Sequence, residues 1–544
     1  MTRTIHCESA SFYTQDGIRL DADLYYPESE EPLPTLLMRQ PYGRKIASTV
    51  VYAHPSWYAR QGYLVVIQDV RGRGTSTGEF KLFANEVADG RETLDWVASL
   101  PQSNGQIGMY GFSYQGMTQL YAAISGSPLL KVLCPAMIAW DLYQDWAYEN
   151  GAFCLQLNLA WAVQIEAENA RRRGDRDAYQ QLYSAARDLR FSDSTPANPD
   201  WFKNLAPHSF YQDWLQSPSD SEYWQRLAPK HQLPTLDLPV LQIGGWFDPH
   251  LRGNLALYET LCGGHSPHKL IIGPWGHLPW GRQLGGQNYG PEAISQIDEW
   301  QIAWFDAYLK GRPNAFSESL PLHLFEMQSN RWLNLADFPH QDRTWYLHSS
   351  GLAAVQEKAG QLLAEENTVP TEDTWVHDPW RPVPSWGGHS GIPAGSLERS
   401  GVDSRTDVVT YTSLPLTETL RICGQPRVSL LVQGDRQSFD LSLVLASVTP
   451  QGQVWPFTQT YCRLQPPQLG QVLEIELKLQ ATCIEIPWGH CLRLSLSGAS
   501  FPAYAVNGGT GQSPSLEELM AQQVITLTCH LDPQHSAQLN LPVL

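Results

Sequence analysis

Residues 109–119 have the sequence MYGFSYQGMTQ, in which Ser113 stands two residues after Gly111. The run before it is short and apolar, which is typical of a buried strand, and the run after it has helical spacing. A sharp turn from strand to helix is how a nucleophilic serine is presented to a substrate. The second glycine of such a turn comes one position late here, at Gly116, with Gln115 where a small residue is usual. The stretch predicts an α/β domain, and the role of Ser113 depends on its partners elsewhere in the chain.

Strand and helix patterns alternate on both sides of this turn, which predicts a parallel sheet with helices on both faces. The alternation stops over 138–235, where the chain is rich in tryptophan and helical in character, and it resumes over 236–314. We therefore predict one α/β domain, begun over 1–137 and completed over 236–314, with a helical insertion between the two parts. The expected elements are a hairpin around Asp16-Gly17, strands at 35–40, 63–69, 107–111, 131–136, 239–246 and 268–275, and helices at 86–100 and 294–311.

The pattern changes again over 315–544. Short runs that alternate apolar and polar residues recur between turn residues, for example LPLHLFEM (320–327) and RVSLLVQGD (427–435). Helical periodicity is nearly absent, so this half is predicted to be an antiparallel sandwich or jelly roll. The segment 375–396, rich in Pro, Gly and Trp, is predicted to be a long loop of this half.

The composition is that of a large globular protein with more than one domain. Its 544 residues, 42% hydrophobic and 17% charged, can form a large core. The net charge of −18 argues against nucleic acid or an anionic membrane as a partner. The first residues have no apolar segment like that of a secretory signal, and the nine cysteines lack the spacing of a disulfide or zinc framework. We therefore expect reduced thiols, no membrane span and a cytoplasmic protein.

Three residues follow predicted strands in the order that a serine nucleophile requires. A serine hydroxyl needs a base and an orienting acid, which in α/β enzymes follow it along the chain as acid and then histidine. Asp248 stands directly after the strand PVLQIGGW, and His277 ends the next one, HKLIIGPWGH. Each residue alone has an ordinary reading, such as a turn aspartate or a loop histidine. Their common context and order predict a Ser113, Asp248 and His277 triad.

Other candidate motifs are weaker. Ser390 in GGHSG (387–391) has the wrong glycine spacing and lies in the β half. The glycine-rich RGRGTSTGEF (71–80) lacks the lysine and spacing of a phosphate loop, so we predict a tight loop beneath the site. His265 and His268 come close to His277 in the sequence but without suitable co-ligands, so no metal site is predicted.

Several stretches together resemble the cocaine-esterase and X-Pro dipeptidyl-peptidase family, the CocE/NonD hydrolases. GFSYQG (111–116) resembles that family's serine turn, in which the late glycine is normal. The other matching stretches are RQPYGR (39–44), DVRGRGTSTGEF (69–80), GGWFD (244–248), GPWGH (273–277), PVPSWGG (382–388) and SGASFPAYAVNGGTG (497–511).

The resemblance implies an α/β-hydrolase domain (1–137 and 236–314), an inserted helical cap (138–235) and a C-terminal β jelly-roll domain (315–544). It also implies that Ser113 is the nucleophile, Asp248 the acid and His277 the base. The hydroxyl of Tyr42 and the backbone N–H of Tyr114 would form the oxyanion hole. No cofactor is implied.

The predicted activity is hydrolysis of small carboxylic esters through an acyl-enzyme. Trp146 and Trp161 match positions where such enzymes place aromatic residues over the acyl group, although both could simply pack helices together. The residues after Asp248 carry no carboxylate, unlike those of the α-amino-acid ester hydrolases.

Two alternatives stay open at this point. An X-Pro dipeptidyl-peptidase would need an acidic clamp for the substrate's N-terminus, for which the cap offers Glu149 or Asp145. A non-catalytic binding protein is the third reading. The expected partner is a small ester or short peptide, and a homodimer is left open.

Overall fold

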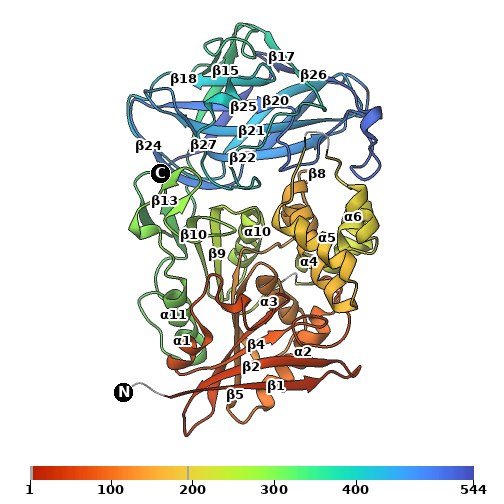
Figure 1. Ribbon diagram of the computed structural model, residues 1–544. Helices are drawn as coiled ribbons and strands as arrows, with labels where there is room; N and C mark the ends of the chain where they lie inside the picture. The colour runs from red at the N-terminus through yellow and green to blue at the C-terminus, as the bar shows by residue number, and fades with distance from the viewer. Residues whose placement is uncertain (1–3, 193–194, 234) are drawn as a thin grey trace.

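The computed structural model describes residues 4–192, 195–233 and 235–544. Figure 1 shows an α/β domain, a group of helices beside it, and a β domain that lies across the ends of both. The predicted class, an α/β-hydrolase domain with an inserted helical cap and a C-terminal β domain, is confirmed. None of the helices in the described part of the chain is both long and apolar enough to cross a membrane.

The α/β domain is built on a ten-stranded sheet with the order β1-β2-β4-β3-β5-β6-β9-β10-β13-β14. From β4 to β13 every neighbouring pair is parallel, and the two edges are antiparallel hairpins. The strands are β1 (Ile5–Tyr13), β2 (Arg19–Pro27), β3 (Leu33–Gln40), β4 (Leu64–Asp69), β5 (Ser103–Phe112), β6 (Leu130–Ala136), β9 (Val240–Phe247), β10 (His268–Gly276), β13 (Leu322–Glu326) and β14 (Arg331–Leu335).

Helices cover both faces of this sheet, which is why β4 and β9 are buried along their whole length. One face packs against α2 and α3 and the other against α1 and α11. α10 follows β9 and packs on β9 and β10. The helices are α1 (Pro55–Arg60), α2 (Glu86–Ser99), α3 (Tyr114–Ile124), α10 (Leu251–Cys262) and α11 (Ile297–Leu309).

The insertion between β6 and β9 forms the cap. Its longest helix, α4, ends where Gly174 adopts φ +78°, a left-handed conformation that closes the last turn. Buried cap residues such as Trp214 belong to the same apolar core as α2 and α3, so the cap is packed firmly on the α/β domain. The cap consists of β7 (Tyr148–Glu149), β8 (Ala152–Phe153), α4 (Leu155–Arg173), α5 (Arg176–Arg187), α6 (Asp200–Leu205), α7 (Phe210–Gln216), α8 (Glu222–Leu227) and α9 (Pro229–Gln232).

The C-terminal domain contains an eleven-stranded, almost wholly antiparallel sheet. The alternation in RVSLLVQG appears as alternating burial along β20. The strands of the sheet are β15 (Asp342–Ser349), β16 (Gly360–Leu363), β17 (Thr371–His377), β18 (Val408–Ser413), β20 (Arg427–Gly434), β21 (Phe439–Val448), β22 (Val454–Leu464), β23 (Leu473–Lys478), β25 (Cys491–Ser497), β26 (Ile525–Leu531) and β27 (Gln538–Pro542). Smaller elements are β19 (Leu420–Gly424) paired with β24 (Thr482–Ile486), β11 (Gln283–Leu284) paired with β12 (Gln287–Asn288), and α12 (Ser400–Asp403).

One strand near the predicted domain boundary joins a different sheet from the one expected. The run 320–327 was assigned to the β half, but β13 pairs in parallel with β10 and extends the α/β sheet, followed by β14. Alternation identifies a strand but not the sheet that it joins. Met327, directly after β13, then bridges to Ile484 of β24, so the two domains are joined at this edge. Buried side chains of β9, β10 and β13 belong to the same apolar cluster as the core of the β domain.

Candidate active site

Ser113 lies at a strained turn between β5 and α3. Its backbone has φ +58° and ψ −125°, a conformation that costs a non-glycine residue energy and that is found mainly at functional sites. Its side chain is almost buried, and its N–H donates to the carbonyl of Ala136 at the end of β6 (2.9 Å). The predicted strand–turn–helix is therefore present, with the serine at its apex.

The position of the second glycine follows from how tightly α3 packs. A Cβ on Gly116 would lie 2.4 Å from Cγ2 of Ile138 and 2.8 Å from the carbonyl oxygen of Ala136. A Cβ on Gly111 would lie 2.4 Å from Cβ of Gln115. Gln115 thus fits because Gly111 leaves it room, while Gly116 lets the helix approach β6. The late glycine is a requirement of packing at this turn.

Asp248 and His277 stand at the carboxyl ends of the neighbouring parallel strands β9 and β10. Nδ1 of His277 lies 2.8 Å from Oδ1 of the fully buried Asp248. Because a carboxylate only accepts, Nδ1 carries the proton and Nε2 is left as the acceptor. The His277 ring packs on Phe112, with 5.6 Å between ring centroids, and Phe112 directly precedes Ser113. The structure therefore brings the three predicted residues to one edge of the sheet.

A glutamine of the β domain holds the loop that carries Asp248. Nε2 of Gln480 donates to the backbone carbonyls of Trp246 (2.9 Å) and Asp248 (3.1 Å). Gln480 is buried, and 232 residues separate it from Asp248 in the chain. No local pattern in the sequence indicated this contact.

Tyr42 reaches the serine from the loop after β3. Its hydroxyl accepts a hydrogen bond from Nε1 of Trp161 in the cap (3.1 Å). Burial raises the pKa of Tyr42 to about 12, although the hydrogen bond from Trp161, the charge of Arg73 and the neighbouring Ser113 hydroxyl lower it. The hydroxyl is therefore protonated at neutral pH and can donate.

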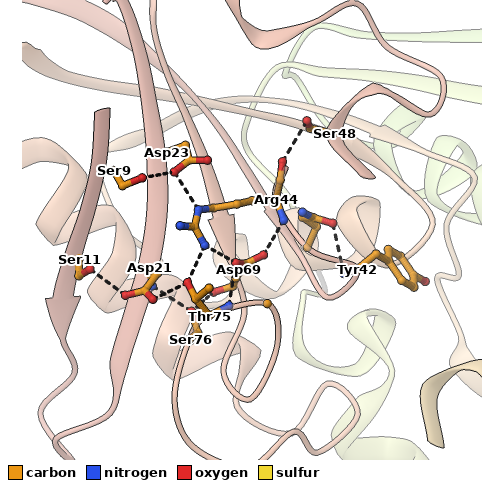
Figure 2. A network of polar contacts seen from close by, with 12 residues as sticks. Ser9, Ser11, Asp21, Asp23, Tyr42, Arg44, Ser48, Asp69, Thr75 and Ser76 are labelled. Atoms are coloured by element: carbon orange, nitrogen blue, oxygen red, sulfur yellow. Dashed lines mark hydrogen bonds and ion pairs between the residues drawn. The ribbon is translucent and has the colours of Figure 1, made fainter. Parts of the chain in front are cut away.

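The loop of Tyr42 is held by Arg44, as Figure 2 shows. The Arg44 guanidinium lies between two carboxylates, 2.9 Å from Asp23 of β2 and 2.6 Å from Asp69 of β4. Its backbone N–H also donates to Asp69 (2.7 Å). The Tyr42 ring points away from this network. The charged pairs thus fix the loop while the tyrosine remains directed toward Ser113.

The glycine-rich motif 71–80 forms a loop against the same carboxylate. Gly74 has φ +51°, and a Cβ there would lie 2.0 Å from the Asp69 carboxylate. Thr75 donates its N–H to Asp69 (3.2 Å), and Ser76 donates its hydroxyl to the Asp69 carbonyl (2.8 Å). The motif supports the Tyr42 loop, in keeping with the expected tight loop.

Tyr114 is the first residue of α3, so its N–H has no carbonyl one turn earlier in the helix to bind. Its hydroxyl donates to Glu86 (2.7 Å), and Glu86 forms an ion pair with Arg39 (2.8 Å). All three side chains are buried. Glu86 and Arg39 therefore anchor the residue after Ser113, a role that no sequence pattern indicated.

Trp146 and Trp161 lie together in an aromatic cluster beside these residues. Their ring centroids are 5.0 Å apart, and Trp161 also packs on Phe210 (5.0 Å). The Trp146 ring packs at a tilt against His250 (4.2 Å between ring centroids), and the His250 ring lies 5.1 Å from the ring of His277. The two tryptophans are thus connected to His277 through His250. The sequence analysis did not select His250, although it stands two positions after Asp248.

Comparison with known proteins places this geometry in a family. Residues 16–279 match the model of the X-Pro dipeptidyl-peptidase (S15 family), and residues 314–540 match the X-Pro dipeptidyl-peptidase C-terminal non-catalytic domain. Over 559 residues, covering 97% of both chains, the sequence is 30% identical to the cocaine esterase of Rhodococcus sp. (strain MB1 Bresler). The chain belongs to the CocE/NonD family. It is a serine hydrolase.

Solved structures give the same fold. An aminopeptidase from the marine sediment archaeon Thaumarchaeota archaeon aligns with a TM-score of 0.81 at 22% identity, over 99% of this chain and 96% of that one. An α-amino-acid ester hydrolase aligns with a TM-score of 0.78 at 21% identity, over 100% and 97%. The resemblance stated from the motifs is confirmed for the family and for the fold.

The two acidic residues considered as a clamp for a substrate ammonium are already engaged in this CocE/NonD chain. Glu149 lies in a buried cluster with Arg252 (2.8 Å), His389 (2.9 Å) and Tyr504 (2.5 Å), here called the junction cluster because it joins the cap, α10 and the β domain. Asp145 accepts from the N–H groups of Trp140 (2.9 Å) and Asp141 (2.6 Å). Burial raises the pKa of Asp145 to about 6.

The remaining candidates lie apart from the serine turn. Ser390 is fully buried, and its hydroxyl forms a hydrogen bond with the Tyr504 hydroxyl of the junction cluster (2.9 Å). Nε2 of His268 lies 3.5 Å from Cys262, away from His277. Within the described ranges, no group of three or more His, Cys, Asp or Glu is arranged to hold a metal ion.

Proposed function

We propose that this serine hydrolase cleaves small carboxylic esters, with Ser113 as nucleophile, His277 as base and Asp248 as the orienting acid. The observation that carries the proposal is the 2.8 Å contact between Asp248 and Nδ1 of His277 at the sheet edge that carries the strained Ser113 turn. The cocaine esterase relative, with which nearly the whole chain aligns, supports an ester as substrate.

Acylation follows from the roles of these groups. Nε2 of His277 accepts the Ser113 proton as Oγ attacks the ester carbonyl, and Asp248 stabilises the imidazolium that forms. The oxyanion of the tetrahedral intermediate receives hydrogen bonds from the Tyr42 hydroxyl and the Tyr114 N–H. One such donor contributes about 3–4 kcal/mol to the transition state. When the intermediate collapses, the C–O bond to the alcohol breaks and His277 returns the proton to the leaving oxygen.

Deacylation repeats the same steps with water. His277 takes a proton from the attacking water, the oxyanion forms in the same hole, and the bond to Ser113 Oγ breaks as the serine regains its proton. The products are a carboxylic acid and the free enzyme. Protein side chains and water perform every step.

Trp146 and Trp161 would form the wall of the acyl pocket. Their rings are packed together at 5.0 Å, beside the hydroxyl of Tyr42 that Trp161 contacts. An aromatic wall favours apolar acyl groups through burial of their surface. We propose short-chain and aromatic acyl esters as the substrate class.

An X-Pro dipeptidyl-peptidase activity is the second candidate, and the S15 family model favours it. That activity needs a carboxylate free to hold the substrate's terminal ammonium. Glu149 is engaged in the junction cluster and Asp145 in the backbone of its own turn. The ester reading is therefore preferred, and a binding protein without activity is the least supported.

Turnover of p-nitrophenyl acetate or butyrate, compared with Ala-Pro-p-nitroanilide, tests the proposal. We expect turnover of the esters and labelling of Ser113 by a fluorophosphonate. Faster turnover of the anilide would favour the peptidase. If no substrate is turned over and no label is incorporated, the binding-protein reading is correct.

A further inference from the structure

The cap contributes a hydrogen bond directly to the residue that we propose as an oxyanion donor. Nε1 of Trp161, in α4, lies 3.1 Å from the hydroxyl of Tyr42, and 119 residues separate the two in the chain. An indole N–H can only donate. The Tyr42 oxygen must therefore be the acceptor, which determines how the rest of the hydroxyl is oriented.

A phenol has one proton and can rotate it about the C–O bond. With one side of the oxygen occupied by the Trp161 donor, the Tyr42 proton has to point elsewhere. Ser113 is the neighbouring residue whose hydroxyl influences the Tyr42 phenol. An oxyanion formed on a carbonyl attacked by Ser113 develops next to that serine. The indole therefore directs the phenolic proton toward the place where negative charge appears.

The indole is itself held in place by packing. Trp161 lies against Trp146 (5.0 Å), Phe210 (5.0 Å) and Trp214 (6.1 Å between ring centroids). All three neighbours are buried. A donor fixed in this way needs little reorganisation when the oxyanion forms, which is what makes a preorganised hydrogen bond effective.

We propose that Trp161 is a positioning residue for the oxyanion hole, acting through its N–H on the Tyr42 hydroxyl, in addition to forming the wall of the acyl pocket with its ring. This inference rests on the proposed function of Ser113 and Tyr42. Donation from Trp161 also polarises the Tyr42 O–H bond and strengthens it as a donor, because hydrogen bonds in a chain reinforce one another. The cap would then be needed for chemistry as well as for substrate binding.

The test separates the N–H of Trp161 from its ring. Trp161→Phe removes the donor and keeps an aromatic side chain. Trp224→Phe is the matched control, because Trp224 is a buried tryptophan of the cap that donates its indole N–H to the carbonyl of Ser217 (3.2 Å). With p-nitrophenyl acetate, whose acyl group is too small to fill the pocket, we expect Trp161→Phe to lower kcat about 5- to 10-fold, as for the loss of one neutral hydrogen bond. KM should stay within about twofold, since the donor acts in the transition state.

The double variant with Tyr42→Phe gives the second readout. If the indole acts through the Tyr42 hydroxyl, Trp161→Phe should have no further effect on kcat once that hydroxyl is gone. The inhibition constant of a small boronic acid, which forms a tetrahedral adduct with the serine, should rise by the same factor as kcat falls. Replacing Trp161 with benzothienylalanine, which exchanges only the N–H for sulfur, keeps the test valid if the Phe variant does not fold.

The outcomes distinguish this inference from the proposed function. If Ser113→Ala retains activity, the proposed function is wrong and the inference falls with it. If Tyr42→Phe lowers kcat but Trp161→Phe has the same effect with and without the Tyr42 hydroxyl, or changes only KM, Trp161 is a pocket wall and only the inference is overturned.

Discussion

Two polar groups of the molecule, one at the junction of the cap with the β domain and one around Ser113, differ in how completely their members are hydrogen-bonded. In the junction cluster, one Glu149 oxygen receives Arg252, His389 and Tyr504, and the other accepts from Thr460 (3.3 Å) and the N–H of Tyr461 (3.2 Å). In the active-site group, defined as Ser113, Asp248, His277 and Tyr42, one oxygen of the Asp248 carboxylate lies 2.8 Å from Nδ1 of His277, and the other, Oδ2, has no hydrogen-bond partner among the described residues. The backbone of Ser113 is strained.

This difference separates structural from chemical roles. Burial alone would raise the pKa of Glu149. This pKa is nevertheless held well below its usual value by the charges of Arg252 and His389 and by the hydrogen bonds from His389 and Tyr504. A fully paired carboxylate of this kind stabilises the fold and has no capacity left for a substrate. The active-site group keeps an imidazole acceptor and a phenolic proton available. The predictions below test whether this division is correct.

The largest effect is expected from Ser113→Ala. Loss of the nucleophile should lower kcat for p-nitrophenyl acetate on the order of 10⁴–10⁶-fold, as in other serine hydrolases. Thermal unfolding should change little, because only a hydroxyl is removed. Ser390→Ala is the matched control: Ser390 is a buried serine of the junction side, so its loss should leave kcat within a few-fold. If Ser390→Ala lost activity and Ser113→Ala kept it, the nucleophile would be Ser390 in the β domain.

Glu149→Gln should act on stability alone. The variant keeps the shape but leaves Arg252 buried without its charge partner, so the free energy of unfolding should fall by about 3–5 kcal/mol. Because the folded-state pKa lies below the ordinary value of 4.5, this contribution is complete above that pH and is lost as the pH falls below it. The two proteins should therefore differ at pH 7 and converge in acid, as measured by urea unfolding.

A surface carboxylate provides the control for that variant. Glu168 pairs with Arg171 on α4, and both side chains are substantially exposed, so Glu168→Gln should change stability by less than about 0.5 kcal/mol. If Glu149→Gln instead abolished kcat in a folded protein, the junction cluster would belong to the chemistry.

Tyr42→Phe should lower activity and leave stability unchanged, the reverse of what is expected for Glu149→Gln. Removal of one oxyanion donor should lower kcat about 10²–10³-fold with little change in KM or in the melting temperature. The network of Arg44 with Asp23 and Asp69, which fixes the loop, stays intact in this variant. Full kcat with reduced stability would show that Tyr42 is only a packing residue.

Much of the fold could be predicted from local patterns. The apolar runs at 107–111, 239–246 and 268–275 are strands of the parallel sheet, and the hairpin around Asp16-Gly17 forms as expected. These features depend on residues close together in the chain, where periodicity and turn chemistry are informative. The order of Ser113, Asp248 and His277 belongs to the same category, and their roles stay a prediction until the variants are measured.

What could not be predicted depends on contacts between distant segments. Three contacts join parts of the chain that share no local pattern. β13 pairs with the α/β sheet, Gln480 binds the loop that carries Asp248, and His389 binds Glu149, 240 residues earlier in the chain. The Trp161 contact with Tyr42 is of the same kind. The resemblance to the family selected both residues but gave no reason to pair them.

The smallest expected effect concerns His250, the buried titratable residue between Trp146 and the ring of His277. Burial lowers the pKa of His250 to about 4, from an ordinary value of 6.5, so the folded protein keeps it neutral. The unfolded chain binds the proton more tightly, and stability is therefore complete above pH 6.5 and is lost as the pH falls toward 4. Between pH 7 and pH 5 this residue should lower the free energy of unfolding by about 2 kcal/mol.

In His250→Phe, which keeps an aromatic ring, that part of the pH dependence should disappear from urea unfolding curves, whereas Trp146→Phe should retain it. An unchanged pH dependence in His250→Phe would mean that the folded protein carries a cation beside His277, and the active-site side of the comparison would then have to include a charged neighbour of the base.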